Sequence, residues 1–143
     1  MTRGFATITP ECEVAFDEVK ETDNLNFVIY EASAHNKNIT VAERGKYQDY
    51  AEFIARFKDD TPRYAVVDFN YDFPTGESAE KQQRHKLVFI TWVPAAASMH
   101  ERSYYTSNKD HLYCALLDIS LHVQATSQVD LAHATILSKF KTL

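Results

Sequence analysis

Hydrophobic and polar residues alternate along the chain with helical spacing in some segments and strand spacing in others, so both kinds of element are predicted. The first signal is Thr9-Pro10 followed by two glutamates. This pattern is typical of a helix start, because threonine caps the first turn, proline fits its first position and carboxylates favour its positive end. We expect a helix over residues 10–21. Its candidate core positions are Val14, Phe16 and Val19.

Residues 25–62 predict a hairpin and a second helix. Residues 25–30 and 39–42 are short β-like runs, and residues 35–38 between them favour a turn. The apolar residues that follow recur at helical spacing, and the helix that they predict ends at Thr61-Pro62. These residues are Tyr47, Tyr50, Ile54 and Phe57.

The strongest strand signals are residues 64–71 and 87–93. Both are nearly continuous runs of β-branched and aromatic residues, which favours central strands covered on both faces. The polar residues between them predict an exposed hairpin loop over residues 73–86, or an extended hairpin tip.

The last third of the chain predicts a long helix, a short strand and a final helix. Pro94 ends the preceding strand, and Ala95 opens a segment of high helix propensity that reaches about Leu117. Residues 103–108 are poor helix formers, so we expect a kink there. Residues 120–125 predict a weak edge strand, and residues 130–140 a last helix. The candidate core positions of that helix are Leu131, Ile136, Leu137 and Phe140.

This order of elements favours an α/β sandwich in which a mixed sheet of five to six strands is flanked by helices on both faces. With 45% apolar residues over 143 positions, the chain can bury the core of one domain, residues 1–143, without disulfides. Three glycines and four prolines argue against a turn-dense all-β design. No apolar run approaches the roughly 20 residues that a bilayer span needs. We expect a soluble, intracellular monomer.

Charge is distributed unevenly. The chain carries a net charge of −5, yet residues 1–60 hold 12 acidic against 7 basic side chains, whereas residues 61–143 hold 8 of each. Residues 81–109 contain five Lys and Arg against one Glu, a local charge of +4. Two interpretations stay open on composition alone: a solvated hairpin tip and helix face, or a docking site for an acidic partner.

Signatures of catalysis and of cofactor binding do not occur in the sequence. It contains no phosphate-binding glycine-rich loop, dinucleotide fingerprint, nucleophile elbow or HExxH motif. Cys12 and Cys114 stand 102 positions apart and outside any zinc-type cluster. The sequence lacks a stripe of basic residues interleaved with aromatic ones, the pattern that would suggest nucleic-acid binding. We therefore expect neither an enzyme nor a cofactor, metal or nucleic-acid partner.

Residues 103–110, Ser-Tyr-Tyr-Thr-Ser-Asn-Lys-Asp, resemble the M-x-Y-A-S-S-K-D segment in the long helix of the actin-depolymerizing factor/cofilin family. Arg63-Tyr64-Ala65 with Asp68 and Tyr71 resembles its C-R-Y-A-x-x-D-x-x-Y strand. Residues 86–94 resemble its K-x-V-F-x-x-W-x-P strand.

The resemblance covers essentially the whole chain in order, since residues 122–125 are similar to the I-Q-A/G strand and residues 15–20 to the first helix. It implies the single-domain ADF-homology fold, with a flexible N-terminus over residues 1–8 and a long kinked third helix.

The resemblance also implies function: a cytoplasmic, cytoskeleton-associated protein that binds actin monomers and filament sides and promotes severing and depolymerization. The monomer-binding residues that it implies are Arg3, Gly4, Phe5, Met99, His100, Arg102, Ser103, Tyr104, Ser107, Asn108 and Lys109. The filament-binding residues that it implies are Lys81, Arg84, Lys86, Lys139 and Lys141.

Departures from the family pattern modify these expectations. His100 stands at the first of two basic positions on the long helix, so its charge depends on pH. Ser103 replaces a large apolar residue, with Met99 and Tyr104 as substitute anchors, which implies altered monomer affinity. Arg3 replaces the regulatory serine and leaves Thr2 as the phosphorylation candidate.

Binding to anionic phosphoinositides is expected to be weak. Tyr113 and Cys114 stand where many family members carry paired basic residues.

Two other functions within the same fold stay open. One is a glia-maturation-factor-like regulator of the branch-nucleating actin-related complex, against which Trp92-Val93-Pro94 and the charged hairpin argue. The other is a monomer-sequestering module without severing, which silent mutations of Arg84 and Lys86 would favour.

Overall fold

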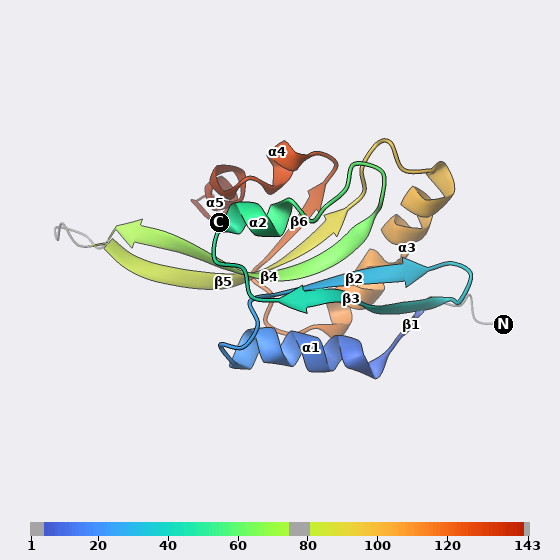
Figure 1. Ribbon diagram of the computed structural model, residues 1–143, viewed down its shortest axis with the longest axis horizontal. Helices are drawn as coiled ribbons and strands as arrows, with labels where there is room; N and C mark the ends of the chain where they lie inside the picture. Colours follow the sequence, from blue (N-terminus) through green and yellow to red (C-terminus); the bar gives the residue numbers. More distant parts are fainter. Residues whose placement is uncertain (1–4, 75–80, 142–143) are drawn as a thin grey trace.

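The computed structural model describes residues 5–74 and 81–141, and within them six strands form one mixed sheet (Figure 1). The strands are β1 (Thr7–Ile8), β2 (Phe27–Ser33), β3 (Asn38–Gly45), β4 (Arg63–Pro74), β5 (Lys81–Trp92) and β6 (Leu121–Ala125). The helices are α1 (Pro10–Glu21), α2 (Tyr50–Ile54), α3 (Met99–Ala115), α4 (Gln128–Leu131) and α5 (His133–Lys141).

The strand order is β1-β3-β2-β4-β5-β6. The outer pairs, β1 with β3 and β5 with β6, are parallel, and the three inner pairs are antiparallel. The predicted hairpin, the two central strands and the edge strand are all present, so the expectation of a mixed sheet is confirmed.

Helices cover both faces of the sheet, as predicted. Along β4, Tyr64 and Val66 join one hydrophobic cluster together with side chains of α1 and α3. Ala65, Val67 and Phe69 join the other cluster, together with side chains of α2, α4 and α5. Successive side chains of β4 point to opposite faces of the sheet and so contribute to both cores. This explains why consecutive positions of β4 are apolar.

The first helix begins at Pro10, as predicted, but the Thr9 side chain makes no capping hydrogen bond, and one position expected to be at least partly buried is mostly exposed. Val14 is 55% exposed. The buried residues of α1 are Cys12, Ala15, Phe16 and Val19. These four follow the i, i+3, i+4, i+7 spacing of one helical stripe, and Val14 lies on the solvent side of that stripe.

The second helix is shorter than predicted. It starts at Tyr50, because the Asp49 side chain accepts a hydrogen bond from the N–H of Ala51 and caps the first turn. Tyr47 lies before the helix and is buried for another reason. Its N–H donates to Asn26 Oδ1 over 2.8 Å, and its hydroxyl donates to the carbonyl of Asp68 over 2.9 Å.

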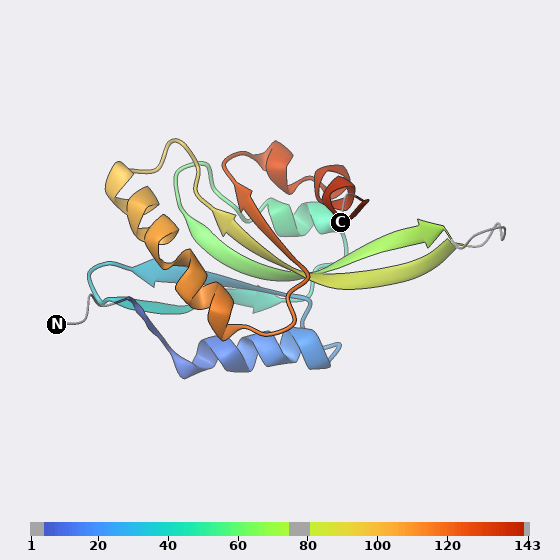
Figure 2. The same cartoon turned by 180° about the vertical axis from the view of Figure 1, so that it is seen from behind.

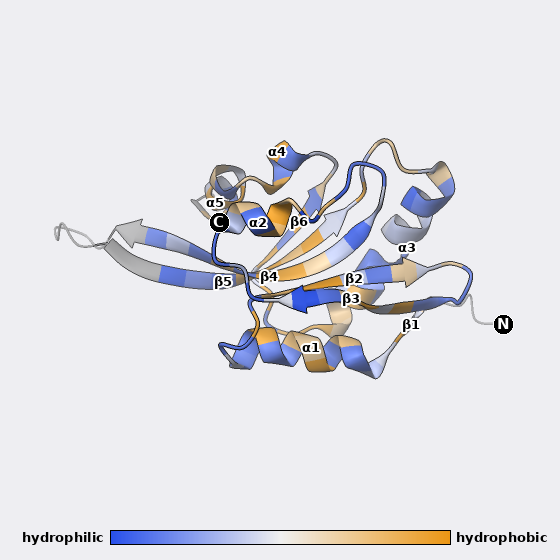
Figure 3. Cartoon of the chain, in the orientation of Figure 1, coloured by the Kyte–Doolittle hydropathy of each residue, from blue (hydrophilic) through white to orange (hydrophobic). Residues whose placement is uncertain are grey.

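Strands β4 and β5 continue as a two-stranded ribbon that projects from the body of the protein (Figures 1 and 2). The loop predicted over residues 73–86 is therefore wrong for 73–74 and 81–86, which are paired strand, and the alternative of an extended hairpin holds. Residues in the middle of β4 and β5 are hydrophobic, and those along the ribbon are hydrophilic (Figure 3). Polarity there reflects solvent around the ribbon rather than a loop.

The third helix starts later than predicted, at Met99, because the Ser98 side chain accepts a hydrogen bond from the N–H of Glu101 and caps it. The kink predicted at residues 103–108 does not interrupt the helix. The predicted last helix is divided into α4 and α5 at Ala132, whose ψ of 144° is not helical.

The N-terminus is not flexible over all of residues 1–8, and the prediction is corrected for residues 5–8. Ala6 is buried, and Thr7–Ile8 pairs with Asn38–Ile39 as the edge strand β1. Backbone hydrogen bonds to β3 hold this segment in place.

Candidate functional site

The helix α3 buries one side and exposes the other. Tyr105, Asn108 and Leu112 form the buried side. Of the residues predicted to bind monomers, Met99, His100, Ser103 and Ser107 are exposed, and Arg102, Tyr104 and Lys109 are partly exposed. Met99 is 74% exposed, so an apolar side chain on this face of the helix is accessible to a partner. Met99, Ser103 and Ser107 recur every four residues and so share one face of the helix, whereas His100 and Tyr104 line a second hollow beside residues 31–36.

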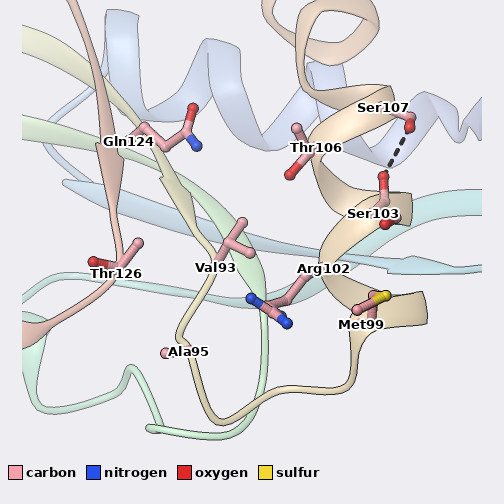
Figure 4. Close-up of a pocket in the computed structure, with 9 residues that line it drawn as sticks. All are labelled: Val93, Ala95, Met99, Arg102, Ser103, Thr106, Ser107, Gln124 and Thr126. Carbon is pink, nitrogen blue, oxygen red and sulfur yellow. Dashed lines mark hydrogen bonds between the residues drawn. The ribbon is translucent and has the colours of Figure 1, made fainter.

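A groove of about 570 Å³ lies between this face of α3 and the ends of β5 and β6 (Figure 4). It is lined by Val93, Ala95, Met99, Arg102, Ser103, Thr106, Ser107, Gln124 and Thr126. The Nε atom of Arg102 is buried without a hydrogen-bond partner, and no ion pair to Arg102 occurs in the described part of the chain. A cation in a groove without a counter-charge favours an acidic partner.

Several side chains of this surface are fixed by internal hydrogen bonds. The Ser107 hydroxyl donates to the carbonyl of Ser103 over 2.8 Å. The Lys109 ammonium donates to Gln124 Oε1 over 2.7 Å and connects α3 with β6. The Tyr104 hydroxyl donates to the carbonyl of Ser33 over 3.3 Å, and burial raises the pKa of Tyr104. The surface is therefore ordered before a partner binds.

Asn108 does not belong to the exposed surface, although the resemblance placed it among the monomer-binding residues. Its side chain is only 4% exposed. It lies one turn from Tyr105 and one turn from Leu112, on the buried side of α3. Helical spacing in the sequence was the signal that could have shown this.

His122 on β6 packs beneath α3 and responds to pH. Its ring stacks on Tyr113 with centroids 5.1 Å apart, and its Nε2 lies 3.0 Å from the Thr91 hydroxyl. Burial, assisted by the nearby Lys109, lowers the pKa of His122 below its usual 6.5, and Asp110 opposes this shift.

We expect the protein to lose stability as pH falls through the range just below 7. The unfolded chain protonates His122 near its usual pKa of 6.5, whereas the folded chain protonates it only at lower pH. Above that range both states are neutral and the effect vanishes. Urea unfolding at about pH 7.5 and 5.5 should show a smaller loss for His122→Gln than for the unmodified protein. The matched variant His35→Gln, at an exposed histidine, should keep the full loss, and an equal loss in both variants would contradict the assignment.

The basic residues of the ribbon follow one another along β5, with Lys86 nearest the body of the protein, then Arg84, and Lys81 at the outer end of the strand. Arg84 and Lys86 are exposed on β5, on either side of His85. The His85 Nδ1 lies 3.0 Å from a carboxylate oxygen of Asp68. Burial raises the pKa of the Asp68 carboxyl, and the neighbouring His85 opposes this shift.

Aromatic contacts join the ribbon to α5. The rings of Tyr71 and Phe140 are stacked with centroids 5.5 Å apart, and His133 stacks on Phe69 at 4.4 Å. His133 Nε2 also donates to the carbonyl of Asn70 over 2.8 Å. The exposed Lys139 lies on this helix. Sequence reasoning missed this connection, because strand and helix are separated by about 70 residues and no local pattern reports their contact.

Some predicted residues fall outside what the structure describes. Thr2, Arg3 and Gly4 lie outside the described residues. The backbones of Lys81 and Lys141 belong to described elements, whereas their side chains lie outside the description. Phe5 is described and is 61% exposed.

Within the described part of the chain, no helix is long and apolar enough to cross a membrane, and no three His, Cys, Asp or Glu side chains gather as a metal site would require.

Comparison with known proteins supports the predicted resemblance. A family model described as cofilin/tropomyosin-type actin-binding protein matches residues 5–141. The cofilin of Yarrowia lipolytica is 33% identical over 139 residues, which cover 97% of this chain and 88% of that protein. The cofilin of Schizosaccharomyces pombe is 32% identical over 132 residues, 92% of each chain.

Solved structures agree. The crystal structure of Streptomyces griseoflavus cofilin superposes with a TM-score of 0.84 at 30% identity, covering 94% of this chain and 96% of that one. The crystal structure of Plasmodium berghei actin depolymerization factor 2 gives a TM-score of 0.80 over the full length of both chains, but at 19% identity it supports the fold alone. The sequence motifs, the sheet with its projecting ribbon and these comparisons establish that the chain belongs to the cofilin/actin-depolymerizing factor family.

Proposed function

We propose that this protein binds actin monomers and the sides of actin filaments and promotes filament severing and depolymerization in the cytoplasm. The observation that carries the proposal is the exposed face of α3, where Arg102 lacks an internal counter-charge beside the exposed Met99. An apolar anchor flanked by a cation suits insertion of the helix into a cleft that carries acidic groups.

The monomer-binding surface in this proposal combines the N-terminal segment with the exposed face of α3. Its described members are Phe5, Met99, His100, Arg102, Ser103, Tyr104, Ser107 and Lys109. Asn108 acts inside the fold and is not a contact residue. Arg3 and Gly4 complete the surface by resemblance, and Thr2 remains the phosphorylation candidate.

The filament-binding surface combines ribbon and α5 cations. Arg84, Lys86 and Lys139 are its described members, and Lys81 and Lys141 join them by resemblance. The contacts of Phe140 with Tyr71 and of His133 with Asn70 support treating ribbon and helix as one unit. The monomer-binding surface and the filament-binding surface would contact two actin subunits at once, and this double contact is the proposed basis of severing.

Phosphoinositide binding is proposed to be weak and the protein to act as a monomer. Tyr113 is occupied by its stack on His122, and neither Tyr113 nor Cys114 is a basic residue. Vesicle binding and analytical ultracentrifugation test these two statements separately.

Co-sedimentation and microscopy test the proposed function. The pure protein should pellet with actin filaments and shorten them. If it does neither, the proposal fails. Monomer binding without any effect on filaments would favour a sequestering module. Release of branches from the actin-related complex, without binding to actin, would favour the glia-maturation-factor-like alternative.

The double variant Arg84→Ala/Lys86→Ala should weaken filament binding by about tenfold, on the scale of two lost charge contacts, and monomer binding by much less. Co-sedimentation and a monomer titration measure the two affinities. Lys46→Ala/Lys58→Ala is the matched control, since it removes the same charge at two exposed positions outside the ribbon and α5. Equal losses of monomer and filament binding would contradict the division into two surfaces.

A further inference from the structure

The segment that precedes α1 is seated between α3 and β3. The N–H of Ala6 donates to Asn108 Oδ1 over 2.9 Å in a buried hydrogen bond. The N–H of Thr7 donates to the carbonyl of Lys37 over 2.9 Å, and the N–H of Thr9 to that of Ile39 over 3.1 Å. Figure 2 shows this segment leading from the N-terminus into α1. One side of the segment is thus fixed by the sheet and the other by the long helix.

Asn108 connects segment and helix through both ends of its amide. While Oδ1 accepts from Ala6, Nδ2 donates to the carbonyl of Tyr104 over 3.0 Å. A buried amide is tolerated only when its polar atoms find partners, and here both do. The family motif M-x-Y-A-S-S-K-D has serine at this place, a shorter side chain with a single hydroxyl.

His111 holds the segment at a second point, one helical turn after Asn108. Its ring stacks on Phe5 with centroids 5.0 Å apart and planes inclined by 12°. Phe5 nevertheless remains 61% exposed. The stack thus fixes the direction of an aromatic side chain that stays accessible to a partner.

We propose that Asn108 and His111 are positioning residues, which hold the N-terminal segment on α3 and present Phe5 and the exposed helix face to the actin monomer as one preformed surface. The inference rests on the proposed function and deepens it. A segment that is already ordered in the free protein loses less conformational entropy on binding. The affinity for the partner is therefore higher.

Asn108→Ala should lower monomer affinity by about tenfold in the otherwise unmodified chain, the scale of ordering one or two side chains. In a Phe5→Ala background the same change should cost no more than about twofold, because both substitutions remove the same contribution and residues that act together are not additive. An equal loss in both backgrounds would overturn the proposal, since Asn108 would then act only through the general fold.

His111→Ala is the milder second variant, because it removes the stack and leaves the buried bond of Ala6 intact. Monomer affinity should fall by about threefold, as expected for one aromatic pair, and His111→Phe should restore it. Cys114→Ala, exposed on the same helix, is the matched control and should bind as the unmodified protein does. A loss that His111→Phe does not restore would overturn the role of the stack.

Hydrogen exchange of the Ala6 amide tests, without actin, whether Asn108 holds the N-terminal segment on α3. Exchange should accelerate in Asn108→Ala at least tenfold relative to amides in the middle of α1, and unchanged exchange would overturn the proposal. If the unmodified protein binds no monomer, the proposed function fails. The exchange measurement distinguishes that failure from a failure of the seating itself.

Discussion

Arg102→Glu should lower the affinity for actin monomers by about a hundredfold, which corresponds to about 2.7 kcal/mol. Loss of one partner from a desolvated charge pair costs about 2–5 kcal/mol, and a reversed charge adds repulsion from an acidic partner. Arg102 has no ion-pair partner among the described residues and its Nε lacks a hydrogen bond, so the substitution breaks no internal ion pair.

A fluorescence titration with actin monomers measures this loss, and thermal unfolding verifies that the variant is folded. Lys58→Glu is the matched control, because it reverses a charge at an exposed position away from α3. A similar decrease in both variants would indicate a general electrostatic effect, and no decrease in Arg102→Glu would remove the helix face from the binding site.

Trp92→Ala should lower the free energy of unfolding by about 3–5 kcal/mol, the usual cost of emptying a large aromatic site in a core. Trp92 is fully buried at the end of β5 and packs on Phe57, with ring centroids 5.7 Å apart. Its indole N–H donates to the carbonyl of Lys58 over 2.8 Å. The substitution therefore removes both packing and the hydrogen bond that holds the segment between α2 and β4.

Urea unfolding measures this loss, and Trp92→Phe separates its two parts. Phenylalanine keeps most of the packing and loses the indole bond, so a cost of about 1–3 kcal/mol is expected from the unpaired carbonyl and the smaller ring. A loss below about 1 kcal/mol in Trp92→Ala would show that Trp92 is not the central residue of this core.

Local signals in the sequence were sufficient for elements whose boundaries are set by their own residues. The start of α1 was predictable because proline favours the first helical position and Pro10 occupies it, and β4 and β5 were predictable because their runs of β-branched and aromatic residues are long. The second helix was predicted to start too early for a non-local reason. The Asn26 side chain, 21 residues earlier, binds the backbone of Tyr47 and keeps it out of the helix.

The candidate site shows the same division between features that the sequence predicts and features that depend on tertiary contacts. The resemblance supplied the exposed face of α3, but a motif compares residue types and not their burial, so Asn108 was included in error. The contacts that orient the surfaces could not be predicted. Phe140 was recognisable as a core residue, yet its stacking partner Tyr71 lies in the ribbon and is brought to it only by the tertiary fold.

The ribbon has a consequence for colloidal behaviour. Strand β2 pairs with β4 only over Tyr64–Val67, and β6 pairs with β5 only over Val88–Trp92. Beyond these limits the two strands pair with each other. Tyr47 and His133 bond the carbonyls of Asp68 and Asn70, so the edges that another strand could extend lie farther out along the described part of the ribbon. Charged side chains such as Arg84 and Lys86 discourage such edge-to-edge association. The cations proposed to bind the filament would thus also keep free copies of the protein from associating through their ribbons. A ribbon without these charges would lose both solubility and filament binding.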